Sequence, residues 1–193
     1  MTNILSEYSN YQCQVLRRSP RTIANYMPVV EEFLSHHAAT GNPAVIGAID
    51  RNQIRTFLCR ASASGRAPTP AIWNLRLSAV RSLFEFLLDT DQLLANPARR
   101  LERQHVQSHE RIPLTFYELA LLAATVERQS DLAYRPRNCA LLLTLVHTAL
   151  RVAEVVSLAV AQFDLEHRVL TGVRVKGGKS LVIVLNEVAV EAI

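Results

Sequence analysis

The segment Cys139–Leu150 most constrains the fold, because its 12 residues carry no formal charge. That length suits a helix buried in a protein core and is too short to cross a bilayer. Arg151 follows directly, so a permanent cation lies at the edge of a core. A guanidinium group is costly to bury without an anionic partner, and its planar fork of donors suits a carboxylate or a phosphate. Glu154 lies one helical turn away, so the pattern indicates either a structural ion pair or an arginine held ready for a phosphate.

A second basic feature lies downstream, in residues 173–185. Two apolar stretches are joined there at Gly177-Gly178, which is a strong signal for a β-hairpin turn. The turn carries Lys176 and Lys179, the only two lysines among 21 basic residues. Lysine, unlike arginine, gives up a proton when its pKa is lowered. The two lysines mark the turn as a candidate reactive site, and chance clustering is the alternative explanation.

Composition predicts a folded protein of one large domain or two small ones. The 193 residues are 49% hydrophobic and 20% charged, which argues against disorder. A net charge of +4 favours a polyanionic partner and leaves simple solubility open. The three cysteines lie far apart, so we expect buried, reduced thiols in a cytoplasmic protein and no metal site. Neither a membrane span nor a secretion signal is evident in the sequence.

The first half of the chain predicts a helical bundle after a loose start. Ser19 followed by Pro20 begins one helix, and Asp50 is placed to cap a second. A third runs from Thr69-Pro70 to about Asp89. Its inner face carries Trp73, Leu77, Val80, Phe84 and Leu87.

The outer face of this third helix is a candidate DNA-binding surface. It presents Asn74, Ser78 and Arg81, which can lie along a groove. Arg76, at the flank of that face, is then expected to reach a phosphate. An ordinary solvated helix face explains each of these residues as well.

The polar segment 98–113 contains four arginines and almost no apolar periodicity, so we expect a linker between domains 1–97 and 114–193. Its arginines can follow a phosphate backbone, although a soluble tether has the same composition. Thr115–Glu118 is a capping box that opens the second domain, and Asn186 is placed to cap a last helix. A hairpin and one helical start do not close a sheet, so we expect this second domain to be truncated.

Together these motifs resemble the tyrosine recombinases, also called the phage integrase family. Three segments match the helical, SAM-like core-binding domain of that family: Ser19–Tyr26, Leu77–Phe84 and Asn96-Pro97. Three others match its catalytic domain: Leu114-Thr115-x-x-Glu118, Thr148-Ala-Leu-Arg-x-x-Glu154 and the hairpin from Lys176 to Leu185. The resemblance implies a mainly α fold with a small antiparallel β-hairpin, in which a SAM-like helical bundle precedes an incomplete α+β integrase-type catalytic domain.

The resemblance also implies a chemistry, namely DNA strand exchange without a metal or a high-energy cofactor. A tyrosine attacks a backbone phosphodiester and forms a 3′-phosphotyrosyl link. Arg151 falls on the first catalytic arginine of the family and Lys176 on its catalytic lysine, the general acid for the departing 5′ oxygen, while Glu154 orients the arginine. The residues expected to bind DNA are Arg21, Thr22, Asn74, Arg76, Ser78, Arg81 and Lys179. The implied partners are double-stranded DNA and further recombinase protomers, because family members act as tetramers on paired sites.

The sequence departs from the family pattern in several places. Ala149 stands where the family usually has glycine, and Gln162 stands near a position that is often aspartate. The His-x-x-Arg motif, a later His or Trp and the nucleophilic tyrosine lie beyond the equivalent of Ile193, and no tyrosine follows Tyr134. We therefore expect a chain that clamps duplex DNA and supplies Arg151 and Lys176 but cannot cleave alone. The alternative is a non-catalytic DNA-binding or regulatory remnant of a recombinase.

Overall fold

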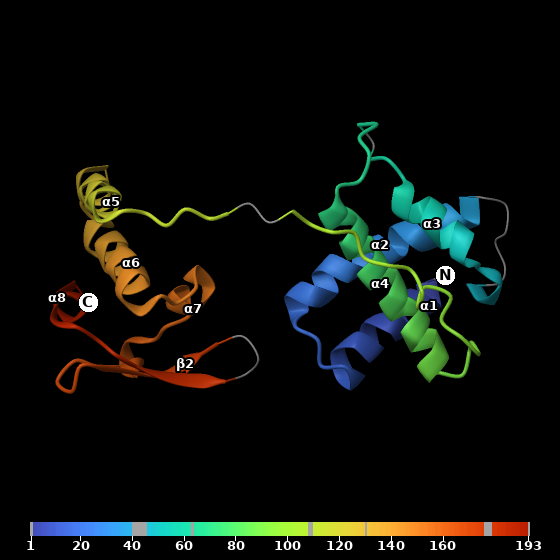
Figure 1. Cartoon of the computed structure of the whole chain (residues 1–193). Coiled ribbons are helices and arrows are strands. Elements are labelled where there is room, and N and C mark those ends of the chain that lie inside the picture. Colours follow the sequence, from blue (N-terminus) through green and yellow to red (C-terminus); the bar gives the residue numbers. More distant parts are fainter. Residues whose placement is uncertain are drawn as a thin grey trace. The chain divides into compact units, whose positions relative to one another are not determined.

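The computed structural model describes residues 2–39, 46–62, 64–107, 110–129, 131–175 and 179–192 (Figure 1). The chain divides into two compact units, Met1–His109 and Glu110–Ile193. We call them the helical unit and the sheet unit, and each is described by itself. The mainly helical fold with a small antiparallel sheet confirms the predicted fold class.

The helical unit is built on four α-helices. They are α1 (Thr2–Asn10), α2 (Pro20–Ala39), α3 (Arg51–Cys59) and α4 (Pro70–Asp89), with a π-helical turn at Tyr11–Val15 and a 3₁₀ turn at Ile46–Ala48. Helix α4 packs against α2 and α3, and α1 packs against α2 (Figure 1). The predicted inner face of α4 is confirmed, since Leu77, Val80, Phe84 and Leu87 are all buried.

The predicted starts of these helices are confirmed by their capping bonds. The backbone N–H of Thr22 donates to Ser19 Oγ at 3.2 Å, and that of Gln53 donates to Asp50 Oδ1 at 2.8 Å. Thr69 Oγ1 accepts from the N–H of Ile72 at 3.3 Å. Such side-chain acceptors satisfy N–H groups that have no partner within the first helical turn.

Two expectations for this unit are wrong. The start of the chain is not loose, because α1 buries Tyr8 completely against Phe86, with ring centroids 5.8 Å apart. The expected linker 98–113 does not begin at residue 98, since Ala98 and Leu101 belong to the core of the helical unit. Apolar side chains three residues apart, on a turn that follows Pro97, therefore extend the helical unit beyond its expected end.

The sheet unit places helices around a three-stranded antiparallel sheet. Its elements are α5 (Phe116–Gln129), α6 (Arg135–Thr148), α7 (Val152–Val156), a 3₁₀ turn at Val160–Gln162, β1 (Phe163–Asp164), β2 (Val169–Arg174), β3 (Ser180–Val184) and α8 (Glu187–Ala192). The strand order is β1-β2-β3, with Phe163 opposite Leu170 and Arg174 opposite Ser180. The predicted hairpin is confirmed as β2 and β3, whereas its turn at Gly177-Gly178 lies outside the described residues. The short strand β1 was not expected.

The capping motifs of the sheet unit are also confirmed. The N–H of Thr115 donates to Glu118 Oε2 at 2.8 Å, and that of Glu118 donates to Thr115 Oγ1 at 3.2 Å. The Thr115 hydroxyl also donates to Glu118 Oε2, at 2.8 Å, and the two bonds that Thr115 donates stabilise the carboxylate and lower the pKa of Glu118. Asn186 Oδ1 accepts from the N–H of Ala189 at 2.8 Å and so caps α8.

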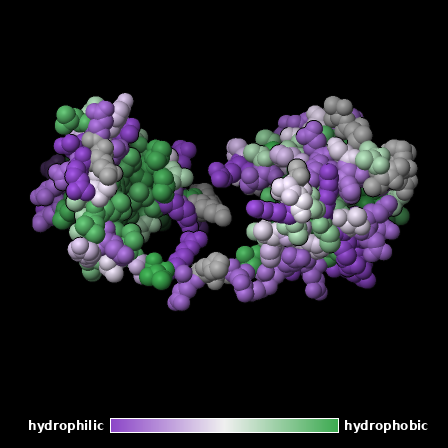
Figure 2. Space-filling model, turned by 90° about the horizontal axis from the view of Figure 1, so that it is seen from above, coloured by the Kyte–Doolittle hydropathy of each residue, from purple (hydrophilic) through white to green (hydrophobic). Residues whose placement is uncertain are grey.

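The sheet unit exposes much of its apolar surface. The apolar segment after Cys139 lies in helix α6, as expected. This helix is not a buried core helix, however, because Thr144 is its one buried residue. Phe116 on α5 is 92% exposed, and Val182 and Val184 on β3 are 69% and 79% exposed. Figure 2 shows the resulting apolar area on this unit, at the left. The expected burial of the cysteines is wrong as well, since Cys13 and Cys59 are exposed. Among the described helices, none is long and apolar enough to span a bilayer.

Candidate functional site

The candidate site begins at a left-handed turn that ends α6. Ala149 adopts φ +53° and ψ +20°, and its N–H donates to the carbonyl of Leu145 at 3.1 Å. Thr148 Oγ1 donates to the carbonyl of Thr144 at 2.6 Å and accepts from the N–H of Leu150 at 3.3 Å. Leu150 then enters the core of the sheet unit. The hydrogen bonds of the turn and the buried side chain of Leu150 therefore fix the position of the next residue, Arg151.

Arg151 is anchored by Glu154 through both its backbone and its side chain. Its N–H donates to Glu154 Oε2 at 2.8 Å, and its Nη1 donates to Glu154 Oε1 at 2.9 Å. The Glu154 side chain is only 10% exposed, whereas that of Arg151 is 69% exposed. Within the described residues, Nε and Nη2 of Arg151 donate to no protein group. A buried carboxylate thus orients an exposed guanidinium group, which keeps donors for a second anion.

The hairpin contributes Lys179, which is exposed, and whose carbonyl accepts from the N–H of Val175 at 2.9 Å. This bond joins the residues that follow β2 and precede β3. Lys176 lies outside the described residues, so its assignment as the general acid stays a prediction.

Gln162 binds the backbone of β2 through its side chain, a role that the sequence did not indicate. Its Nε2 donates to the carbonyls of Thr171 and Gly172 at 3.0 and 2.9 Å, and its Oε1 accepts from the N–H of Ala159 at 2.8 Å. Gly172 has φ +67°, a conformation that favours glycine. Gln162 is nine and ten residues from the carbonyls that it binds, so no local signal in the sequence indicates this contact.

The predicted phosphate contact of Arg76 is wrong, because this side chain is buried. It is only 8% exposed, and its Nη1 donates to the carbonyl of Arg60 at 2.6 Å. Its Nη2 lies 3.4 Å from Glu32 Oε1, and its guanidinium carbon lies 5.3 Å from the centre of the Phe57 ring. Arg76 therefore ties α4 to α3 and α2.

The outer face of α4 is not a free groove-binding surface either. Asn74 Nδ2 donates to the carbonyl of Gln104 at 2.8 Å, and Arg103 Nη2 donates to Ser78 Oγ at 3.0 Å. Arg81 donates to the carbonyls of Ala98 and Leu101. All three predicted contacts, Asn74, Ser78 and Arg81, hold the segment after Pro97 against α4.

At the start of α2, Arg21 is exposed and Thr22 is half-buried. Thr22 Oγ1 shares a hydrogen bond of 2.8 Å with Ser19 Oγ, so part of its polar capacity is used in the cap. Arg21 and Lys179 thus keep the exposure that a phosphate contact requires. Among the residues that the structure describes, no group of three or more His, Cys, Asp or Glu side chains is placed to hold a metal ion.

Two family descriptions match this chain in succession. "Phage integrase, N-terminal SAM-like domain" matches residues 5–91, and "Phage integrase family" matches residues 113–193. The second match contains the Arg151 turn and the hairpin.

Curated relatives show the same similarity along most of the chain. The tyrosine recombinase XerC of Lacticaseibacillus casei (strain BL23) is 28% identical over 177 residues, which cover 91% of this chain and 57% of that protein. XerC of Pelobacter propionicus (strain DSM 2379 / NBRC 103807 / OttBd1) is 29% identical over 176 residues, with 91% and 56% covered. The chain therefore spans little more than half the length of these relatives.

Solved structures share the fold. The Tn1549 transposon integrase in complex with circular intermediate DNA matches with a TM-score of 0.65 at 17% identity, over 98% of this chain and 62% of that one. The XerH site-specific recombinase bound to a palindromic difH substrate matches with a TM-score of 0.62 at 21% identity, over 88% and 50%. With both family descriptions matched in order, this chain belongs to the tyrosine recombinase (phage integrase) family.

Proposed function

We propose that this chain acts in site-specific DNA recombination or integration, where it binds duplex DNA and uses Arg151 to hold the reacting phosphate. The observation that carries the proposal is the Arg151–Glu154 pair. Glu154 binds one nitrogen of the guanidinium group at 2.9 Å and leaves the rest of an exposed fork available. A guanidinium group that is held in place before the substrate arrives loses little conformational entropy on binding. It then stabilises the negative charge that builds on the non-bridging phosphate oxygens.

Lys176 is the proposed general acid, which protonates the 5′ oxygen as it leaves. A lysine suits this step because it carries a transferable proton on a long side chain. Support comes from the bond between the N–H of Val175, which precedes Lys176, and the carbonyl of Lys179, because it joins the ends of the two hairpin strands. Glu154 orients Arg151 and exchanges no proton in this scheme.

The proposed DNA complex is a clamp in which both units contact the backbone. The Tn1549 integrase and XerH structures both contain DNA, which supports a duplex as the partner. Arg21 in the helical unit and Lys179 in the sheet unit are exposed and are the remaining sequence-predicted contacts. Further recombinase protomers, arranged as a tetramer on paired sites, complete the proposed assembly.

Fluorescence anisotropy with a labelled duplex tests this proposal. Arg151→Gln is expected to weaken binding by about 10- to 150-fold, because a hydrogen bond to a charged group contributes about 1.5–3 kcal/mol. The matched control is Arg168→Gln, which removes an arginine that already pairs with Glu187 at 2.8 Å. In wild type the logarithm of the affinity should fall linearly with the logarithm of salt concentration, and Arg151→Gln should reduce that slope by about 1. An equal loss of DNA affinity in the two variants, or a DNA affinity that does not depend on salt concentration, would contradict the proposal.

We further propose that this chain alone does not cleave DNA. Its five tyrosines all precede Arg151 in sequence. Tyr8 is fully buried and Tyr11 donates its hydroxyl to Asp89, so neither is placed as a nucleophile. A nicked suicide substrate should therefore yield no covalent protein–DNA adduct on a denaturing gel, and recovery of an adduct would refute this part.

The arrangement of the tyrosines also favours a second candidate function, that of a non-catalytic DNA-binding or regulatory remnant. Such a protein would occupy recombination sites without reacting. Adding the chain to an intact recombinase distinguishes the two functions. A remnant inhibits strand exchange in proportion to its occupancy of the site, whereas a chain that contributes Arg151 restores exchange by a recombinase that lacks the equivalent arginine.

A further inference from the structure

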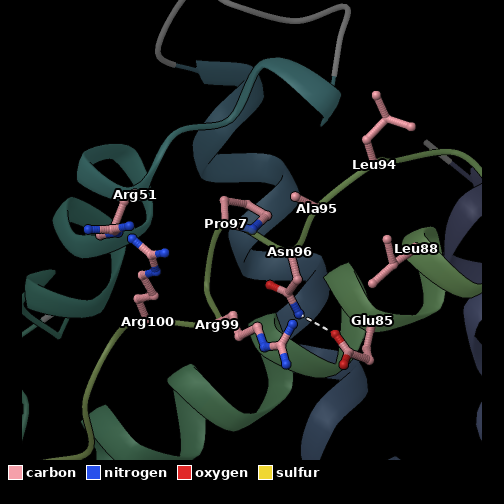
Figure 3. Close-up of a pocket in the computed structure, with 9 residues that line it drawn as sticks. All are labelled: Arg51, Glu85, Leu88, Leu94, Ala95, Asn96, Pro97, Arg99 and Arg100. Carbon is pink, nitrogen blue, oxygen red and sulfur yellow. Dashed lines mark hydrogen bonds between the residues drawn. The ribbon is translucent and has the colours of Figure 1, made fainter.

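The helical unit contains a pocket of about 710 Å³ that the proposed function does not use. The pocket lies where the end of α4, the segment 94–100 and the start of α3 meet (Figure 3). Leu88 and Pro97 give it an apolar wall, while Arg51, Arg99 and Arg100 supply positive charge. Its volume lies within the range of pockets that bind small molecules.

The three arginines of this pocket have no protein partner. Within the described ranges, no ion pair or hydrogen bond involves the guanidinium group of Arg51, Arg99 or Arg100. The side chains of Arg51 and Arg100 point toward one another (Figure 3). Two cations that face each other repel, so an anion between them relieves the repulsion. Arg76 and Arg81, in contrast, are satisfied by backbone carbonyls of the same unit.

The one carboxylate of the pocket is already engaged. Glu85 Oε2 accepts from Asn96 Nδ2 at 2.6 Å, and Asn96 Nδ2 also donates to the carbonyl of Arg81 at 3.1 Å. Asn96 is only 8% exposed, and its own carbonyl accepts from the N–H of Arg99 at 3.2 Å. The backbone that carries Arg99 and Arg100 is therefore held in place. Three arginines and one glutamate leave the pocket with a formal charge of +2.

We propose that this pocket binds a phosphate group, which Arg51 and Arg100 hold between them. Guanidinium groups bind phosphate oxygens through paired N–H donors, and an arginine stays charged at every physiological pH. The pocket is larger than a phosphate group, so the apolar wall at Leu88 and Pro97 is available to the rest of a phosphorylated molecule. The phosphate comes either from a DNA backbone or from a free phosphorylated ligand. In the DNA case this contact is additional to those of the proposed function and rests on it.

Calorimetric titration of the full chain with pyrophosphate tests the phosphate site. Wild type and the control Arg66→Gln, which removes an exposed arginine elsewhere in the helical unit, should bind saturably. The double variant Arg51→Gln/Arg100→Gln should bind at least tenfold more weakly at matched ionic strength. Arg168→Gln, which removes an arginine paired with Glu187 in the sheet unit, should also bind like wild type. Binding that remains in the double variant is assigned to Arg151, so the failure of this pocket and the failure of the proposed function are distinguished. Equal affinity in the double variant, or no saturable binding by wild type, overturns the proposal.

Amide NMR shifts of wild type provide a measurement that does not depend on any variant. Pyrophosphate should perturb the amide signals of Arg51, Asn96 and residues 98–100 most, and perturbations confined to other regions count against the pocket. A labelled duplex then identifies the source of the phosphate. If the double variant also loses DNA affinity, the source is a DNA backbone; if DNA affinity is unchanged while pyrophosphate binding is lost, the source is a free phosphorylated ligand.

Discussion

Replacing Ala149 with glycine should stabilise the sheet unit. Ala149 has φ +53°, and a side chain with a Cβ atom in the left-handed region costs about 1–2 kcal/mol relative to the right-handed one. Glycine adopts this conformation without that cost, although its greater freedom in the unfolded chain removes about 0.4–1 kcal/mol of the gain. The expected net effect of Ala149→Gly is therefore an increase of about 0.5–1 kcal/mol in the free energy of unfolding.

The assay is thermal unfolding followed by circular dichroism. For a unit of this size, a gain of about 0.5–1 kcal/mol raises the midpoint by about 2–8 °C. The single tryptophan, Trp73, lies in the helical unit, so its fluorescence follows that unit separately and should not change. Residue 149 takes no part in the bonds between Arg151 and Glu154, so Ala149→Gly should retain the DNA affinity of wild type.

Ala153→Gly is the matched control, because it makes the same chemical change at an exposed position inside α7. Glycine in a right-handed helix interior costs about 1 kcal/mol relative to alanine. The two substitutions should therefore shift the midpoint in opposite directions. If Ala149→Gly lowers the midpoint as Ala153→Gly does, strain at the left-handed turn is not the reason for the effect.

Three further predictions follow from the helical unit. Arg76→Met should lower the free energy of unfolding of this unit by about 2–4 kcal/mol, measured by urea denaturation, because it removes a donor from the carbonyls of Phe57 and Arg60 and one of the two arginines that pair with Glu32. Arg21→Gln should have the reverse profile, with stability unchanged and DNA affinity reduced severalfold by anisotropy; reduced stability in Arg21→Gln would contradict the assignment of an exposed contact. Burial and the neighbouring Arg60 lower the pKa of His36, so the folded state favours the neutral imidazole. The contribution of His36 to stability is therefore present above the ordinary pKa of about 6.5 and declines as the pH falls below that value. Arg60→Gln should raise the pKa of His36 in an NMR titration, and an unchanged pKa would exclude the charge effect.

Local signals predicted most of the helices, because a cap depends only on residues three positions apart. Ser19, Asp50, Thr69 and Thr115 all accept the bonds that their sequence context indicated. The Arg151–Glu154 pair was predictable for the same reason, since both residues lie on one turn. These interactions are encoded within single segments, and distant residues do not alter them.

Contacts between distant segments were not predictable from periodicity. Arg76 lies on the flank of an amphipathic helix, where a charged residue indicates solvent, yet the carbonyl of Arg60 at the end of α3 provides a buried acceptor. Asn74 and Arg81 look solvated in sequence because the segment that they bind, residues 98–104, looks like a linker. The two wrong predictions have one cause. The outer face of α4 and the segment 98–104 bind each other, and the sequence of neither one indicates the other as its partner.

The arginines of this chain illustrate why charge alone is a weak guide to a nucleic-acid surface. Arg76 and Arg81 donate to backbone carbonyls, Arg151 shares its donors between a buried carboxylate and solvent, and the guanidinium groups of Arg51 and Arg100 face each other and bond to no side chain among the described residues. Substituting the first kind should reduce stability, and substituting the last kind should reduce phosphate binding without unfolding the protein. Because the same residue type supports both roles, a basic composition indicates that a polyanion is a plausible partner, and only the pattern of satisfied and unsatisfied donors indicates where it binds.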